Sequence, residues 1–261
     1  MLKALTTSAT GLEAQQANID RIANDLANVN TDAYKRETTE FQDLMYENTR
    51  EPGERQGAST VSPTGVQKGL GGRVGSAHKL FEQGAAKVTN NQYDLMIEGK
   101  GFLPITKANT GETVYTRAGS FKLDAQGRMS LSDGSLLQPQ ITIPTEATSV
   151  VIAENGEVKA ITTEGEQVIG QIQVTNFINP QGLQAMGGNF YKQTPASGQA
   201  VAVVPGEGGT GVLMQGALEA SNVNVANSMI EMIGAQRGYE MNTRVMSVAD
   251  KMLEATTNIV R

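Results

Sequence analysis

The sequence predicts an α+β chain that is mainly β, with a long helix at each end and a central all-β domain. Apolar residues recur every seven positions near both ends of the 261-residue chain, a spacing typical of helices in coiled-coil contact. Between the ends the apolar period changes to two, which indicates strands, and 29 glycines against 8 prolines predict many turns. We expect an N-terminal helix at 1–30, an extended connector at 31–70, a β domain at 71–215 and a C-terminal helix at 216–261.

Nothing in the N-terminal segment breaks a helix, because residues 1–30 contain no proline and one glycine, Gly11. Four apolar residues lie seven apart, and two more follow three positions after members of that series. This seam is narrow, as in a coiled coil. Its expected contact residues are Leu5, Leu12, Ile19, Ile22, Leu26 and Val29.

The C-terminal helix is predicted by six apolar residues in one seven-residue register, with small or short side chains three positions after each of the first five. Asn222 or Asn224 is the expected N-cap. Gly234 and Gly238 each cost about 1 kcal/mol relative to alanine within a helix, so they mark either a break or a close contact. The expected contact residues are Val225, Met232, Tyr239, Met246, Leu253 and Val260.

The two seams predict helix packing, and two kinds of partner are open. Chain ends often lie close together, so the two helices can pair within one chain. A helix from Val225 to Val260 is roughly 53 Å long, however, which exceeds what a domain of this size needs. One pair of helices also cannot enclose all of the stripe residues. We therefore expect the seams to pack between molecules.

Short antiparallel strands are expected in the central domain. Alternating residues at 121–123 and 129–131, on either side of Asp124–Gly127, predict a hairpin with a four-residue loop. Further strands are expected at 101–106, 113–117 and 168–178.

A second hairpin is predicted at Asn155-Gly156, the strongest turn signal in the chain. A two-residue loop at this point places Val150 opposite Ile161 and Ala153 opposite Val158. Apolar residues then face each other across the two strands, which favours this register.

The composition excludes several kinds of chemistry. With no cysteine, the chain has no disulfide, cysteine nucleophile or thiolate metal site. The single histidine, His78, is not accompanied by a Gly-x-Ser-x-Gly nucleophile motif. The glycine-rich stretch Gly69–Gly75 has Val74 where a dinucleotide fingerprint needs glycine, and we interpret it as a bend. We expect no catalytic, cofactor-binding or metal-binding residues, and no enzyme activity.

Charge and hydropathy narrow the range of partners. The formal net charge is −6 and the lysines and arginines are not clustered, which argues against nucleic acid as a partner. No run of about 18 apolar residues occurs, so we predict no direct insertion into a membrane by a helix. The start of the chain lacks the continuous apolar segment of a cleaved secretory signal.

Several motifs resemble the bacterial flagellar rod and hook family and lie in order along nearly the whole chain. The N-terminal motif is Ala23–Arg36 (ANDLANVNTDAYKR). The C-terminal motifs are Leu218–Val225 (LEASNVNV) and Ala235–Asn242 (AQRGYEMN). Glu98–Phe102 (EGKGF) and Tyr115–Phe121 (YTRAGSF) are similar to the middle domain of the family.

One stretch is similar to a segment specific to the distal rod members of this family. It runs through Phe41–Tyr46 and Arg50–Gly53, and hook members usually carry larger outer domains. Two positions depart from the family pattern, since Ala33 stands where glycine is frequent and Gly238 where alanine is common. The expected rod-specific residues are Tyr46, Arg50, Glu51, Pro52, Gly53, Glu54 and Arg55.

The resemblance implies a structural subunit of the flagellar basal-body distal rod, a rigid drive shaft that crosses the periplasm and transmits torque from motor to hook. It implies export through the flagellar type III apparatus and polymerisation through the terminal helices into a helical homopolymer. The implied partners are other copies of the chain, the proximal rod proteins, the hook protein and the surrounding ring proteins, and no cofactor is implied.

Other functions are open at this point. A hook or proximal rod subunit is the alternative within the family. A peptidoglycan-acting, rod-associated enzyme is an alternative from another class, although no segment of the sequence is spare to form its catalytic domain. A trimeric coiled-coil adhesin shares the seven-residue spacing but does not need a helix at each end of one β domain.

Overall fold

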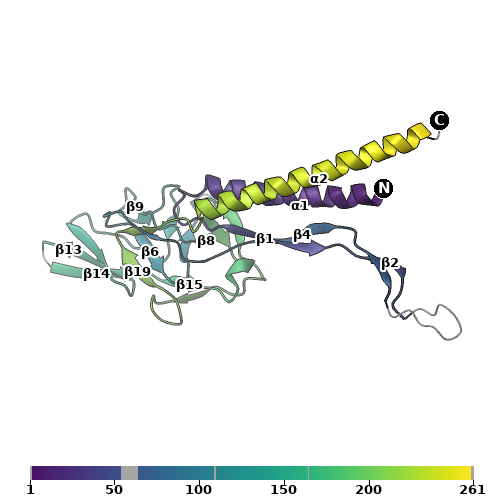
Figure 1. Cartoon of the computed structure of the whole chain (residues 1–261). Coiled ribbons are helices and arrows are strands. Elements are labelled where there is room, and N and C mark those ends of the chain that lie inside the picture. Colours follow the sequence, from purple (N-terminus) through teal and green to yellow (C-terminus); the bar gives the residue numbers. More distant parts are fainter. Residues whose placement is uncertain (1, 54–63, 109, 164, 260–261) are drawn as a thin grey trace. The chain divides into compact units, whose positions relative to one another are not determined.

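The structure is a computed structural model that describes residues 2–53, 64–108, 110–163 and 165–259 (Figure 1). The chain divides into two compact units. The first, here called the helix unit, comprises Met1–Ala27, Glu37–His78 and Asn224–Arg261. The second, here called the β unit, comprises Asn28–Arg36 and Lys79–Val223.

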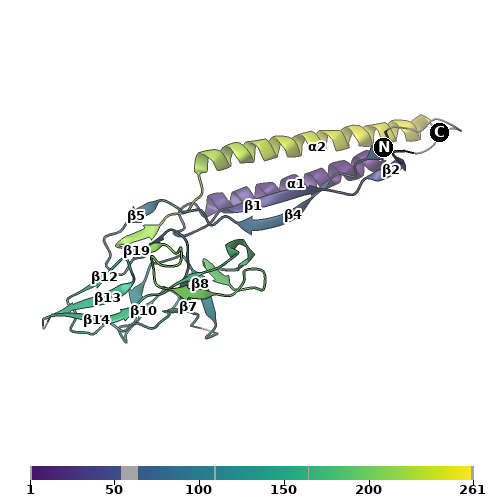
Figure 2. The same cartoon turned by 90° about the horizontal axis from the view of Figure 1, so that it is seen from below.

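The helix unit contains two long helices, α1 (Leu2–Ala27) and α2 (Val225–Ile259). At 1.5 Å per residue they are about 39 Å and 52 Å long. They run antiparallel and contact each other, because Gly11 of α1 lies against Asn242 of α2, and Gln15 against Gly238 (Figure 2). The predicted helix at each end of the chain is confirmed.

The start of α2 lies later than the predicted C-terminal segment, because Ala217–Glu219 forms a strand, β20. Asn224 is the N-cap, since its Oδ1 accepts a hydrogen bond of 3.2 Å from the backbone N–H of Asn227. Asn222 is engaged elsewhere, and accepts a hydrogen bond of 2.7 Å from the N–H of Arg36. From its cap the helix continues unbroken through both of its glycines.

The segment expected as a connector, 31–70, contains three of the four strands of a β ribbon in the helix unit, and the fourth lies in residues expected to begin the β domain. The four ribbon strands are β1 (Glu37–Asp43), β2 (Glu47–Arg50), β3 (Val66–Lys68) and β4 (Gly72–Lys79). β1 pairs with β4, and β2 pairs with β3 in antiparallel register. Gly71 lies between β3 and β4 with a φ of +109°, a conformation that favours glycine. The interpretation of Gly69–Gly75 as a bend fits Gly71 only, because Gly72–Gly75 form the start of β4.

Short strands build the β unit, as predicted for the middle of the chain. Its largest sheet has the order β16-β17-β8-β7-β11-β10-β9, and the smaller sheets are β12-β13-β14, β15-β18, β19-β6 and β20-β5. The remaining bounds are β5 (Ala86–Val88), β6 (Leu95–Glu98), β7 (Leu103–Thr106), β8 (Thr113–Thr116), β9 (Lys122–Leu123), β10 (Met129–Ser130), β11 (Leu136–Leu137), β12 (Ser149–Ile152), β13 (Glu157–Thr162), β14 (Gly165–Gln171), β15 (Val174–Asn176), β16 (Gln184–Gly187), β17 (Phe190–Lys192), β18 (Val201–Val203) and β19 (Val212–Gln215). A short 3-10 turn, η1 (Pro180–Gly182), precedes β16.

The first predicted hairpin is formed by β9 and β10, with a loop one residue shorter than expected. Met129 pairs with Leu123, and the N–H of Asp124 donates to the carbonyl of Arg128 at 2.9 Å. The loop therefore has the three residues Ala125–Gly127. The side chains of Asp124 and Arg128 also form an ion pair at 2.7 Å, which stabilises this turn.

The second predicted hairpin exists, but its predicted register is wrong by one residue. Val150 pairs with Ala160, not with Ile161. The N–H of Gly156 donates to the carbonyl of Ala153 at 2.9 Å, and Gly156 has a φ of +84°. The loop therefore has three residues and ends in a left-handed glycine, a common alternative to the two-residue turn. The observed register buries Val150, Ile152, Val158 and Ala160.

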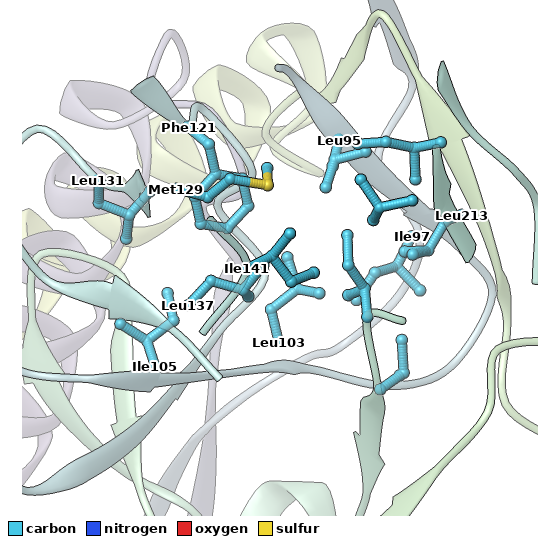
Figure 3. Packing of buried hydrophobic residues seen from close by; sticks show 14 of the residues in the cluster. Leu95, Ile97, Leu103, Ile105, Phe121, Met129, Leu131, Leu137, Ile141 and Leu213 are labelled. Atoms are coloured by element: carbon cyan, nitrogen blue, oxygen red, sulfur yellow. The ribbon is translucent and has the colours of Figure 1, made fainter. Parts of the chain in front are cut away.

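One apolar cluster forms the main core of the β unit (Figure 3). Its members come from strands far apart in the sequence and include Leu95, Ile97, Leu103, Ile105, Phe121, Met129, Leu131, Leu137, Ile141 and Leu213. A second cluster is aromatic, with edge-to-face contacts among Phe102, Tyr115, Phe177 and Tyr191. Neither α1 nor α2, over the residues that the structure describes, has the apolar length that a membrane crossing requires.

Candidate assembly surfaces

The predicted seam residues of α1 are buried or half-buried. Ile22 is 1% exposed, and the remaining predicted residues Leu5, Leu12, Ile19, Leu26 and Val29 are half-buried. Val29 lies beyond the end of α1, in the turn that follows the helix. α1 contacts both α2 and β1, so these elements cover its apolar side.

The predicted seam of α2 is covered only in part. Met232, Met246 and Leu253 are half-buried, and Ala235 and Ala249, which lie three residues after two of them, are buried. The other predicted residues differ, because Val225 and Tyr239 are exposed and Val260 lies outside the described residues. The helices thus pair within one chain, and packing of these residues between molecules stays a prediction.

Polar contacts of Arg21 tie α1 to the other elements of the helix unit. Its guanidinium forms ion pairs with Asp25 at 3.1 Å and with Glu231 of α2 at 3.0 Å. It also donates a hydrogen bond of 2.8 Å to the carbonyl of Glu37 at the start of β1. The Asp25 carboxylate is buried and accepts a hydrogen bond from the N–H of Glu37. The end of α1, the beginning of β1 and the first turns of α2 are therefore joined.

A second apolar stripe on α2 is exposed, and the sequence interpretation missed it. Its large residues are Met241, Val245, Val248 and Met252, which are 62%, 48%, 49% and 53% exposed. Spacings of four, three and four residues place them on one helix face. Gly234, on the same face, has no atom within 4 Å of the position of an added Cβ. The spacing was visible in the sequence, but the seven-residue register that begins at Val225 selects a different face.

The predicted rod-specific residues lie on the β ribbon. Tyr46, Arg50, Glu51, Pro52 and Gly53 are exposed, and Glu54 and Arg55 lie outside the described residues. A hydrogen bond to the Asp43 carboxylate raises the pKa of Tyr46. Next to this stretch, Glu47 forms an ion pair with Lys3 of α1, and the hydrogen bond from Lys3 lowers the pKa of the Glu47 carboxyl. The ribbon is thus linked to α1 near the rod-specific residues.

A buried charge cluster in the β unit was not predicted from the sequence. The Glu219 carboxylate accepts hydrogen bonds from Lys35 Nζ at 2.5 Å and from Arg117 Nε at 3.0 Å. All three side chains are at least 98% buried. Burial, followed by the charge of Arg117, lowers the pKa of Lys35. Lys35 and Glu219 are 184 residues apart, so no local pattern could reveal the pair.

Residues of the types that bind metals do not form a cluster in the described part of the chain. His78 lies in β4 and is half-buried. Within the described ranges, no group of three or more His, Asp or Glu residues could hold a metal ion.

Comparison with known proteins identifies similar chains over the full length. Residues 96–160 match the family described as "Flagellar hook protein FlgE/F/G D1 domain", and residues 214–259 match "Flagellar basal body rod FlgEFG protein C-terminal". The chain is 45% identical over 262 residues to the flagellar basal-body rod protein FlgG of Caulobacter vibrioides, with 99% of each chain covered. It is 43% identical to FlgG of Borreliella burgdorferi and 37% identical to FlgG of Bacillus subtilis, with 100% of each chain covered.

Proposed function

Since the chain belongs to the family of flagellar basal-body rod proteins FlgG, we propose that its terminal helices polymerise it into the rod. It is a structural subunit of the rod in the flagellar basal body. The names of its relatives indicate no catalytic activity. More specifically, we propose that it forms the distal rod, a rigid shaft that transmits torque from the motor to the hook.

One observation supports polymerisation through the helices: α2 exposes large apolar residues on several sides. Besides the exposed residues between Met241 and Met252, three more lie near the beginning of α2. Met229, Ile230 and Ile233 are 53%, 68% and 49% exposed. A helix with apolar residues almost all round is normally buried on all sides. Exposed apolar patches also mark interaction sites in soluble proteins. Coiled-coil packing of α1 and α2 with helices of neighbouring copies would remove these side chains from water.

The β ribbon suits a second role, which is to stiffen the polymer. Arg50 and Glu51 present opposite charges beside Pro52 and Gly53, and all four residues are exposed. Each exposed ion pair contributes only about 0.2–1 kcal/mol, but contacts of one ribbon with neighbouring copies would recur along the whole rod. The proximal rod proteins, the hook protein, the ring proteins and the type III export apparatus complete the proposed set of partners.

The test uses full-length protein and follows polymer formation by light scattering and electron microscopy as concentration increases. Met246→Asp places a carboxylate in the half-buried contact between α2 and α1, where an unpaired charge is costly. Polymer should be lost while the cooperative unfolding of the β unit is retained. The matched control is Val151→Asp, which introduces the same charge at an exposed valine of β12. Normal polymers from Met246→Asp would contradict the proposal, as would a wild-type protein that never polymerises.

A further inference from the structure

We propose that the exposed face of α2 binds α1 of a second copy of the chain, so that each subunit joins the next through unlike helix faces. This inference rests on the proposed function and names the surface and its partner. We call this face the outer stripe, and its members are Gly234, Met241, Val245, Val248, Met252 and Ala255.

The outer stripe is free within its own subunit. Its four large side chains are about half exposed or more, whereas the face beside it contacts α1 through Ala235 and Ala249, which are buried. One face of α2 thus completes the intrachain helix pair, and the neighbouring face has no partner among the described residues. A second helix laid on the outer stripe would not disturb the first contact.

A row of basic residues borders the outer stripe. Arg237, Arg244 and Lys251 lie seven residues apart and are all exposed. Each lies three or four positions from members of the stripe, and such positions are neighbours on a helix surface. Within the described part of the chain, none of the three takes part in an ion pair. The row therefore offers three free positive charges at a repeat of about 10.5 Å.

α1 presents a matching surface on the side that faces solvent. We call it the acidic strip, and its exposed members are Thr6, Glu13, Gln16, Asp20, Ala23 and Ala27. Glu13 and Asp20 lie seven residues apart, the same repeat as the basic row, and form no ion pair with any residue that the structure describes. From Thr6 to Ala27 the strip spans about 32 Å, as the outer stripe does from Gly234 to Ala255. Charge, repeat and length are thus complementary.

The partner must be a different copy, because α1 already uses its apolar side within the subunit. Ile22 is buried on that side, whereas Glu13 and Asp20 face solvent. The acidic strip and the outer stripe of one chain therefore remain available at the same time. A contact between two unlike surfaces leaves one of each free at the ends, so addition continues without closing into a dimer. This is the geometry that an open-ended rod requires.

Charge exchange tests the inference without a need to know the direction of the two helices. Two double variants each reverse the charge on one side of the contact: one combines Arg237→Glu and Arg244→Glu, and the other combines Glu13→Lys and Asp20→Lys. Each should raise the concentration required for polymerisation about tenfold, since attraction becomes repulsion at two charge pairs. All four substitutions together should restore polymerisation to near the wild-type concentration. Lys122→Glu, at an exposed lysine of the β unit, is the charge-matched control and should have no effect.

Disulfide trapping supplies an independent readout, because the chain contains no cysteine. Gln16 lies midway between Glu13 and Asp20, and Met241 lies midway between Arg237 and Arg244, so both helix directions bring them together. When oxidised glutathione is added as the oxidant, a mixture of Gln16→Cys and Met241→Cys chains should form a disulfide-linked heterodimer during assembly. If the acidic strip contacts Arg244 and Lys251 instead of Arg237 and Arg244, Val248→Cys should replace Met241→Cys as the reactive partner. Mixtures that contain Val151→Cys in place of either α2 cysteine should give no such dimer.

The outcomes separate this inference from the proposed function. If wild-type protein polymerises and Met246→Asp does not, but the charge exchanges have no effect and neither α2 cysteine crosslinks to Gln16→Cys, the terminal helices assemble through another face and the inference is overturned. If neither wild-type protein nor the fourfold charge exchange polymerises, the proposed function itself fails. Rescue by the fourfold exchange, together with the predicted crosslink, establishes the contact.

Discussion

Replacement of Glu219 by glutamine should strongly destabilise the β unit. The carboxylate is the single negative charge in a cluster with Lys35 and Arg117, and all three side chains are at least 98% buried. Its Oε1 also accepts a hydrogen bond of 2.8 Å from the N–H of Gly84. Glutamine keeps the size of the side chain but leaves two buried cations without a counter-charge. It also turns an NH₂ group toward one of their donors.

The expected loss follows from this geometry. Removal of one partner from a buried ion pair costs about 3–5 kcal/mol, a large share of the 5–15 kcal/mol by which domains are typically stable. For a unit of this size the melting temperature should fall by roughly 6–20 °C. Lys35→Met is the informative contrast, because it leaves a neutral pair of Arg117 and Glu219. Its cost should stay below about 2 kcal/mol.

Urea unfolding followed by near-ultraviolet circular dichroism of the buried tyrosines measures the effect. Glu166→Gln, at an exposed residue of β14, is the matched control. Burial already lowers the pKa of Lys35 from 10.5, so the folded state binds fewer protons than the unfolded state. Its contribution to stability therefore rises as pH increases toward 10.5, and the deficit of Glu219→Gln should shrink over that range. A deficit within about 1 kcal/mol of the control, or one that does not change with pH, would refute the reasoning.

Three further predictions concern separate parts of the molecule. Gly71→Ala should destabilise the contact of the ribbon with α1 more than Gly53→Ala does, as measured by amide exchange. Both glycines have positive φ, but an added Cβ at Gly71 would lie 2.2 Å from Thr10 Oγ1 whereas at Gly53 it meets nothing within 4 Å. Burial raises the pKa of Tyr191 to about 12, so the folded state keeps the phenol proton to higher pH than the unfolded state does. The free energy of unfolding should therefore fall by about 2–3 kcal/mol between pH 10 and 12. Tyr191→Phe should abolish that loss in urea titrations. An equal-length Gly/Ser replacement of residues 46–62 should leave polymerisation intact but give rods that curve in electron micrographs, and rods as straight as wild type would show that the segment is only a tether.

Local pattern was sufficient where the controlling interactions are local. The seven-residue spacings predict both helices because helical side chains at that spacing share one face. The hairpin at Asn155-Gly156 was also correctly placed. Its register was not, because a three-residue loop with Gly156 in the left-handed conformation competes with the two-residue turn. Burial of both strands against the core selects the former.

The same difference between local pattern and long-range packing applies to the candidate assembly surfaces. The residues Met232, Met246 and Leu253 were predicted from their spacing as contact residues, and the structure shows them half-buried on α2. The outer stripe has spacing just as regular in the sequence. Which stripe is covered and which is exposed depends on where α1 lies, and the pattern of α2 contains no information about that position.

The sequence by itself determined that this chain has two terminal helices, a β-rich middle and the motifs of a rod protein, because each of these is a property of short stretches. Only the tertiary structure decided which side of α2 stays exposed, how the strands of the ribbon pair, and that Lys35, Arg117 and Glu219 share one buried cluster. The physical reason is distance along the chain. Backbone propensity and side-chain spacing act over a few residues, whereas burial and ion pairing depend on segments that only folding brings together.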